Sequence, residues 1–241
     1  MNDQLQILPQ VDTDRELFRV CRPVVRSDRK GQQPGLKDQA CQETIKLVER
    51  VFTGTAIPQV VIFAAVERGS GCSWMCARTA EILSARVEGL VCLVDANFHS
   101  PSLHRHFEIE DPGNSNDELA SAPAQQLVRP GRSNLWLLSY APVNGDWRTP
   151  LSFYRLESRL SELRKNFTYV LIDAPPINAY ADATLLGRMA DGMVMILEAN
   201  TTRREAARRA KDSLDAAGIR LLGAVLNKRT FPIPERLYSR L

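Results

Sequence analysis

Short, continuous runs of apolar residues recur along this chain and are separated by segments with helical spacing. Six runs have the length and the Val, Ile and Leu content of buried strands; they lie at 60–66, 90–96, 135–141, 169–175, 192–199 and 220–227. Helices are expected at 38–52, 73–87, 152–165, 180–190 and 203–217. Strands that are apolar throughout and alternate with amphipathic helices predict a doubly wound α/β fold, a mostly parallel sheet with helices on both faces.

Two segments interrupt this alternation. Residues 1–36 are polar and broken by prolines, and we expect a flexible tail with a short strand within 17–25. Residues 108–134 are polar and rich in Pro and Gly, as is typical of a surface excursion. The sequence therefore predicts an N-terminal tail followed by one domain over 37–241.

Composition and charge narrow the class of protein. The chain has 241 residues, a net charge of +3 and 44% hydrophobic residues, as in soluble globular proteins. The chain has no dense block of Lys and Arg, so its sequence does not predict a nucleic-acid partner. The basic face with Arg204, Arg208 and Lys211 is either solvated or a docking surface for an acidic partner or lipid headgroups. Five cysteines without a Cys-x-x-Cys pair favour a reducing cytoplasm. With no signal-peptide pattern and no long apolar run, the protein would reach the inner face of a membrane only through a partner.

A glycine-rich loop, "ERGSGCS" at 67–73, connects the first strand to its helix. Gly69 and Gly71 permit positive φ angles, and the start of the helix presents free N–H groups that can bind phosphate. Ser73 occupies the position of a hydroxyl that ligates Mg²⁺. An ordinary strand–turn–helix connection needs the same glycines, so the loop alone leaves both interpretations open.

Acidic residues stand at the ends of two other strands. Ligands of open α/β sheets bind beyond the carboxyl ends of the strands, where Asp95 and Asp173 could supply oxygen ligands to a cation. The alternative is a helix N-cap role for each aspartate. Two such residues beside a glycine-rich loop favour a phosphate and cation site.

Two other chemistries are weaker candidates. Cys72 at a helix N-terminus could be a low-pKa thiolate, but no base is placed to activate it. His99, His104 and His106 could bind a metal, yet they lie in a proline-containing loop without a nearby cysteine.

Three segments together resemble the bacterial tyrosine kinases of exopolysaccharide biosynthesis (CpsD/CapB-type), a branch of the MinD/ParA-like P-loop ATPases. Residues 90–107 are similar to the second phosphate-site motif of that family, and residues 169–202 to its Walker B strand and following helix. Residues 221–229 resemble its last strand, in which Asn227 matches an asparagine that reads adenine. The resemblance spans about residues 40–230.

The resemblance implies autophosphorylation of a C-terminal tyrosine cluster by Mg·ATP and a membrane partner that controls polysaccharide chain length and export. It implies catalytic roles for Asp95 and Asp173, and Mg²⁺ ligation by these two residues and Ser73. The implied nucleotide-binding residues are Arg68, Gly69, Ser70, Gly71, Cys72, Ser73, Trp74, Asn227 and Lys228.

The chain departs from the family pattern at residues that carry charge. Cys72 replaces the loop lysine, Asn97 replaces the second aspartate of an Asp-x-Asp pair, and His99 replaces an arginine. Arg68 is a candidate to replace the lysine in part, the alternative being a solvated arginine.

The family's other signatures are also reduced. Its Glu-x2-Arg-x2-Arg motif, linked to ring assembly, becomes Glu43, Lys46 and Glu49, and Tyr238 is the only tyrosine after Asn227. These losses favour a non-catalytic protein of the pseudokinase type, a regulatory or scaffolding component of capsule or exopolysaccharide biosynthesis and export. We expect weak or vestigial binding of ATP or ADP and Mg²⁺, and a homo-oligomer is a further candidate assembly. The alternatives are an active tyrosine autokinase or ATPase, and a MinD/ParA-like positioning ATPase.

Overall fold

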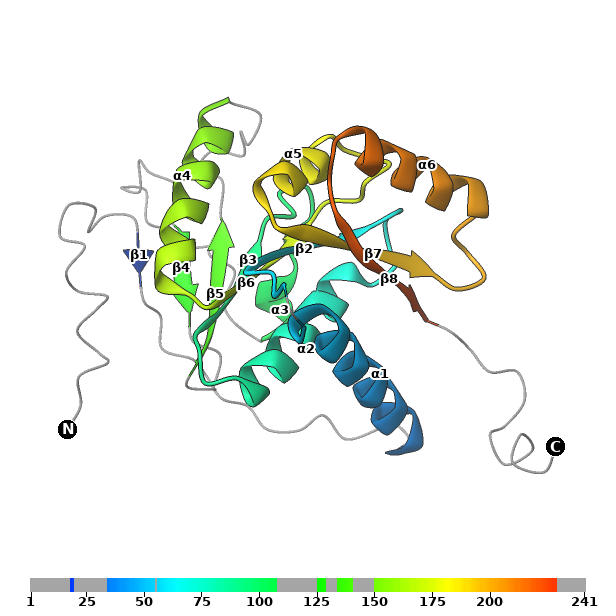
Figure 1. Cartoon of the computed structure of the whole chain (residues 1–241), viewed down its shortest axis with the longest axis horizontal. Coiled ribbons are helices and arrows are strands. Elements are labelled where there is room, and N and C mark those ends of the chain that lie inside the picture. The colour runs from blue at the N-terminus through cyan, green and yellow to red at the C-terminus, as the bar shows by residue number, and fades with distance from the viewer. Residues whose placement is uncertain are drawn as a thin grey trace.

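The protein is built around one sheet with helices on both of its faces (Figure 1). The computed structural model describes residues 18–19, 34–54, 56–107, 125–128, 134–140 and 150–228. Six parallel strands form most of the sheet: β2 (Val60–Ala65), β3 (Val91–Asp95), β5 (Leu135–Tyr140), β6 (Tyr169–Ala174), β7 (Gly192–Glu198) and β8 (Leu221–Asn227). β1 (Phe18–Arg19) pairs with β4 (Gln125–Val128), which runs antiparallel to β5. The strand order is β1-β4-β5-β3-β6-β2-β7-β8.

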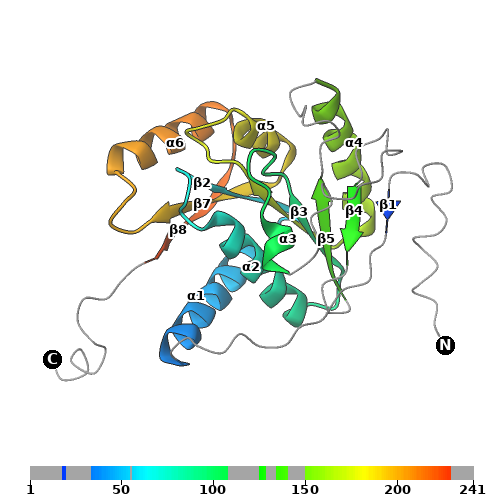
Figure 2. The ribbon, with the colours of Figure 1, turned by 180° about the vertical axis from the view of Figure 1, so that it is seen from behind.

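The helices divide between the two faces of the sheet. α1 (Pro34–Phe52), α2 (Cys72–Arg86) and α3 (Leu103–His106) cover one face, and α4 (Pro150–Asn166), α5 (Asp182–Met189) and α6 (Arg204–Ala216) cover the other (Figures 1 and 2). Two apolar clusters fill the two layers, one on each face. This arrangement confirms the predicted doubly wound α/β fold.

The central strands form because their side chains are apolar on both faces. Every residue of β2 and β3 is buried, and both strands are rich in Val. Each strand therefore contributes alternate side chains to both apolar clusters. α6 shows the complementary pattern, since Ala206, Ala210 and Leu214 recur at four-residue spacing on the buried face and most of its other residues are charged.

Most element boundaries agree with the sequence prediction, with three differences. α1 begins at Pro34, so the last residues of the predicted tail are helical, and the proline takes a position that helix starts tolerate. β4 lies within the predicted excursion over 108–134, and α3 was not predicted. Residues 1–17 and 20–33 of the tail, and Tyr238, lie outside the described residues.

A polar network joins the amino ends of β2 and β7 to α4. Asp191 Oδ2 accepts hydrogen bonds from the amides of Gln59 at 2.8 Å and Val60 at 2.7 Å. Arg164 binds the same carboxylate through both terminal nitrogens, at 2.9 and 3.1 Å.

No helix within the described ranges is both long and apolar enough to cross a lipid bilayer.

Replacement of Asp191 by alanine is expected to destabilise the fold by about 2 kcal/mol, because two backbone amides at the start of β2 and one guanidinium lose their acceptor. Urea unfolding followed by circular dichroism measures the change. Glu43→Ala is the control, since its ion pair with Lys46 is exposed and three residues apart in α1. Equal midpoints for the two variants would contradict a structural role for the network.

Candidate functional site

The loop between β2 and α2 has the backbone geometry that the sequence predicts. Gly69 and Gly71 have φ angles of +85° and +80°, in the left-handed region that favours glycine. A side chain at Gly71 would also collide with Asn227, because its Cβ would lie 2.5 Å from Asn227 Nδ2. The buried Ser70 hydroxyl donates to the Glu67 carbonyl at 3.0 Å. The loop is therefore a defined turn that directs the first amides of α2 toward the carboxyl edge of the sheet.

The end of β8 holds this loop from the side. The Asn227 side-chain amide donates to Ser70 O at 2.8 Å, and Lys228 Nζ donates to Gly69 O at 2.6 Å. Lys228 also pairs with Glu198 at 3.2 Å and has a φ of +56°. Both residues were predicted as nucleotide-binding and lie against the loop, where they satisfy its carbonyl groups. Adenine recognition by Asn227 stays a prediction.

The two predicted acidic residues lie next to each other on adjacent strands. Asp95 and Asp173 are register partners in the β3–β6 pair. Asp95 Oδ2 accepts hydrogen bonds from the amides of Ser102 and Leu103, each at 3.0 Å. These amides lie at the start of α3, whose N-cap residue is Ser102, so Asp95 caps this helix from the end of β3 and is not its N-cap residue. Burial raises the pKa of Asp95, and the backbone hydrogen bonds partly offset that effect.

Asp173 is fully buried, and neither of its oxygens has a hydrogen-bond partner within the described residues. Burial, and next the nearby Asp95 carboxyl, raise the pKa of Asp173 to about 8, while the Ser73 hydroxyl and the Cys72 thiol lower it. The group is therefore largely protonated at neutral pH. Burying a carboxyl group without a partner is costly, which indicates that this position is suited to a ligand.

The residues here fit a Mg²⁺ ion that is shared with a phosphate ligand. Asp173 supplies unpartnered oxygens, and Ser73 supplies a nearby hydroxyl. Mg²⁺ prefers oxygen ligands and keeps water or phosphate oxygens in its shell. Among the described residues no group of three or more His, Cys, Asp or Glu side chains could hold a metal ion unaided.

The thiols are buried and poorly suited to nucleophilic chemistry. Burial, then Asp173, and for Cys72 also Cys76, raise the pKa of both Cys72 and Cys76 well above the usual value. A thiol that keeps its proton is a weak nucleophile. The structure therefore disfavours the low-pKa thiolate considered for Cys72.

The three histidines do not gather into one site. His99 Nε2 lies 2.8 Å from Asp182 Oδ2, His106 Nε2 lies 3.7 Å from Glu81 Oε1, and His104 is a buried residue of α3. The alternative of a three-histidine metal site is thus not supported by the part of the chain that is described.

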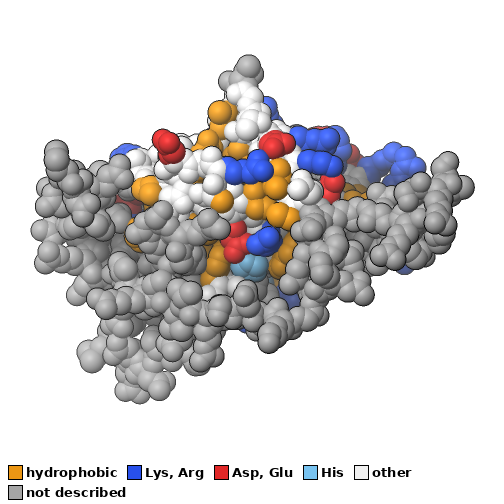
Figure 3. Space-filling view, turned by 90° about the horizontal axis from the view of Figure 1, so that it is seen from below, with side chains coloured by type: hydrophobic (Ala, Val, Ile, Leu, Met, Phe, Trp, Pro, Cys, Tyr) orange, Lys and Arg blue, Asp and Glu red, His pale blue; other side chains and the backbone are white. Residues whose placement is uncertain are grey.

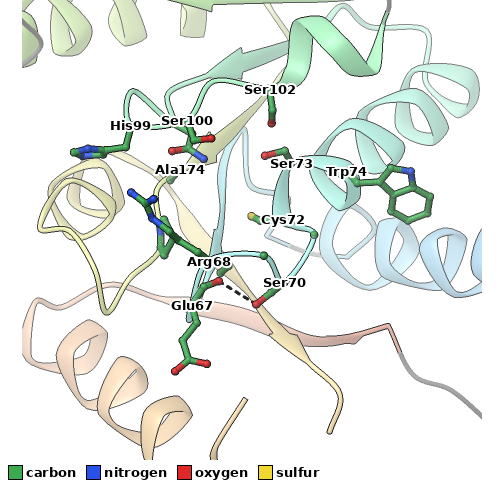
Figure 4. Close-up of a pocket in the computed structure, with 15 residues that line it drawn as sticks. Glu67, Arg68, Ser70, Cys72, Ser73, Trp74, His99, Ser100, Ser102 and Ala174 are labelled. Atoms are coloured by element: carbon green, nitrogen blue, oxygen red, sulfur yellow. Dashed lines mark hydrogen bonds between the residues drawn. The ribbon is translucent and has the colours of Figure 1, made fainter. Parts of the chain in front are cut away.

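A pocket of about 310 Å³ lies between the loop and the segments that follow β3 and β6 (Figure 4). Its lining includes every loop residue from Glu67 to Trp74, together with Asn97, His99, Ser100, Ser102, Ala174 and Pro176. The side chains of Ser73 and Ser102 approach each other across it, whereas the Trp74 indole extends away (Figure 4). The structure thus brings the predicted loop residues to one cavity, with Asp95 and Asp173 beside them and Asn227 and Lys228 behind the loop.

Two residues beside this pocket were not predicted. Tyr180 stacks on the His99 ring with centroids 3.5 Å apart and an interplanar angle of 14°. The Tyr180 hydroxyl accepts a hydrogen bond from Arg68. Asp182 Oδ2 lies 2.8 Å from Nε2 of the His99 ring. Both residues follow the turn after β6, and their place beyond the carboxyl end of a strand was the available signal.

Comparison with known proteins agrees with this geometry. No protein-family model matches the sequence. The chain is 31% identical over 161 residues to the tyrosine-protein kinase YwqD of Bacillus subtilis, an alignment that covers 66% of this chain and 68% of YwqD. Among solved structures, the VpsO kinase domain is similar, with a TM-score of 0.68, 23% identity and coverage of 81% of this chain and 97% of that domain. MinD in the MinC:MinD cell division complex of Aquifex aeolicus shares the fold at a TM-score of 0.54 and 18% identity, over 76% of this chain and 72% of that one.

The orphaned carboxyl group predicts a pH-dependent stability. Between about pH 4 and pH 8 the unfolded chain ionises at Asp173 while the folded protein keeps the proton, so the free energy of unfolding falls as the pH rises through this range. The Asp173→Asn variant cannot ionise there. We expect its melting temperature relative to the native protein to rise from pH 4 to pH 8 in calorimetric scans without ligand.

Asp215→Asn serves as the control, because Asp215 is an exposed partner of Lys211 on α6. Its melting temperature should follow that of the native protein across the same pH range. A constant difference between Asp173→Asn and the native protein would contradict the raised pKa.

Proposed function

This chain belongs to the family of bacterial tyrosine-protein kinases, and we propose that it is a non-catalytic member that binds ATP or ADP weakly. In this proposal it acts as a regulatory or scaffolding component of capsule or exopolysaccharide biosynthesis and export. The proposal rests on one observation above all: the position expected to hold the phosphate-binding lysine carries a buried, protonated thiol.

The substitution removes charge where phosphoryl transfer needs it. Catalysis of this reaction depends almost wholly on positioning and on electrostatic stabilisation of the transferring group. Cys72 begins α2 and lines the pocket, but its thiol cannot neutralise phosphate oxygens. Asn97 lines the same pocket with an amide that cannot serve as a carboxylate base. The transition state carries more charge than bound nucleotide, so chemistry should suffer more than binding.

Several features support retained nucleotide binding. The glycine conformations and the free amides at the start of α2 are those of a phosphate-binding loop. Ser73 and Asp173 remain as oxygen donors for Mg²⁺. Loss of one charge-assisted contact costs about 1.5–3 kcal/mol, which is about 10- to 150-fold in affinity. The retained loop amides and oxygen donors, together with the loss of this one contact, predict weak binding of Mg·ATP and Mg·ADP.

The proposed partner is the cytoplasmic segment of a membrane protein that controls polysaccharide chain length. Arg204 and Arg208 are exposed on α6 and offer positive charge to an acidic segment of such a partner. On the face of the molecule that carries α1 and α2, Lys and Arg side chains stand beside Asp and Glu (Figure 3). Peripheral membrane location and self-association belong to the same proposal.

An active kinase is the alternative that one observation favours, since Asp95 and Asp173 both remain at the carboxyl edge of the sheet. Incubation of the purified protein with γ-labelled Mg·ATP separates the two functions. We expect no tyrosine labelling, because the charge that stabilises the transferring phosphoryl group is missing. Strong labelling that is lost in Ser73→Ala, Asp173→Asn and Tyr238→Phe would overturn the proposal in favour of an autokinase.

Restoring the lysine tests the same site from the opposite direction. Cys72→Lys should bind Mg·ATP at least about tenfold more tightly than the native protein, because the ammonium adds a charge-assisted contact at the loop. Isothermal titration calorimetry measures the change, and the melting temperature reports whether the variant folds. The control is Arg78→Lys, a substitution to lysine on α2 that keeps the charge unchanged. Cys92→Lys is unsuitable as a control, because Cys92 lies in β3 within the core. An unchanged affinity in folded Cys72→Lys would contradict the assignment of the loop.

A further inference from the structure

Four side chains form a continuous chain of contacts beside the pocket. Arg68 from the loop donates to the Tyr180 hydroxyl, and its guanidinium carbon lies 5.3 Å from the centre of the Tyr180 ring. The Tyr180 ring stacks on the ring of His99. His99 Nε2 in turn lies 2.8 Å from Asp182 Oδ2. His99 and Asp182 are almost buried, with side-chain exposures of 9% and 13%. The contacts join the loops after β2, β3 and β6.

Arg68 has the features of a ligand-binding cation rather than of a surface residue paired with a neighbour. Within the described residues no carboxylate forms an ion pair with it. Its guanidinium points toward His99 and Ser100, whereas the carboxylate of Glu67 points the opposite way (Figure 4). The arginine lines the pocket, and among the described residues the hydrogen bond to the Tyr180 hydroxyl engages one of its nitrogens. Its other N–H groups have no acceptor within that part of the chain and can bind an anion.

We propose that Arg68 supplies the positive charge that the loop lysine would supply, and that Tyr180 holds it in place against His99 and Asp182. Arg68 is then a phosphate-binding residue, and Tyr180 a positioning residue that acts through it. The inference rests on the proposed nucleotide binding and identifies the cation of that same site. A planar guanidinium anchored at one end binds phosphate oxygens with less loss of side-chain freedom than a mobile one.

The strand order indicates which phosphate Arg68 contacts. Tyr180 follows β6, on one side of β2, whereas Asn227 ends β8, on the other side of β2 beyond β7. If Asn227 faces the base, the phosphate chain runs over the loop toward the β6 side. Its terminal phosphate then lies nearest to Arg68. ATP should therefore depend on Arg68 more strongly than ADP does.

Calorimetric titration of the 241-residue chain with Mg·ATP and Mg·ADP tests the inference. Arg68→Gln should weaken Mg·ATP binding about 10- to 100-fold and Mg·ADP binding less, so that the ratio of the two affinities falls. Arg68→Lys should retain part of the Mg·ATP affinity. Tyr180→Phe keeps the ring that stacks on His99 and removes the hydroxyl, and we expect a loss of about threefold to tenfold for Mg·ATP alone.

Arg78→Gln is the matched control, because it removes the same charge from α2, where Arg78 pairs with Glu81 outside the pocket lining. Its affinities should equal those of the native protein. Melting temperatures of all variants should lie close together, since the guanidinium of Arg68 is exposed.

The outcomes separate this inference from the proposed function. Equal ATP and ADP affinities in Arg68→Gln and the native protein would overturn the role of Arg68 and leave the proposed non-catalytic function intact. Absence of measurable nucleotide binding by the native protein would overturn both this inference and the weak nucleotide binding of the proposed function, while the scaffolding role would stand. Tyrosine labelling by Mg·ATP together with a loss of affinity in Arg68→Gln would overturn the proposed function and support the inference.

Discussion

An uncompensated carboxyl group in the middle of the sheet is the constraint on which the site depends. Asp173 lies on β6 between β2 and β3, and its register partner on β3 is a second buried carboxyl, that of Asp95. Helix-start amides satisfy Asp95, but none reaches Asp173. Such an arrangement is stable only if the group keeps its proton or receives a cation. Burial of this carboxyl group lowers the stability of the fold, and the packing of the other elements offsets that loss.

The loop and its surroundings answer to that constraint in an unusual way. A thiol begins α2 beside Asp173 and adds no positive charge. Two cationic side chains lie at the loop: Arg68 lines the pocket, and Lys228 binds the Gly69 carbonyl. Lys228 neutralises Glu198 and satisfies a loop carbonyl, so its charge is already in use. Arg68 has a hydroxyl as its partner and keeps its charge available.

The sequence is informative where one physical signal dominates. Strands such as β2 and β3 are predictable because both of their faces are apolar, and the glycine loop is predictable because positive φ angles require glycine. α3 is not, because four residues have too little periodicity and their helical start depends on Asp95 across a turn. Tyr180 is missed for a similar reason, since its importance comes from His99, which is distant in the chain and carries no pattern of its own. The pKa of Asp173 likewise depends on tertiary burial that no local motif records.

The contacts between β8 and the loop have a consequence for biosynthesis. Residues 69–71 leave the ribosome early, whereas Asn227 and Lys228, which bind the Ser70 and Gly69 carbonyls, are made more than 150 residues later, at sequence separations of 157 and 159. β2 also waits for both of its neighbours, β6 and β7. Domains of this kind fold as units rather than from one end. A nascent chain therefore lacks the contacts that hold the loop over 67–73 until residues 227 and 228 have been translated, and a product truncated before them would lack these contacts.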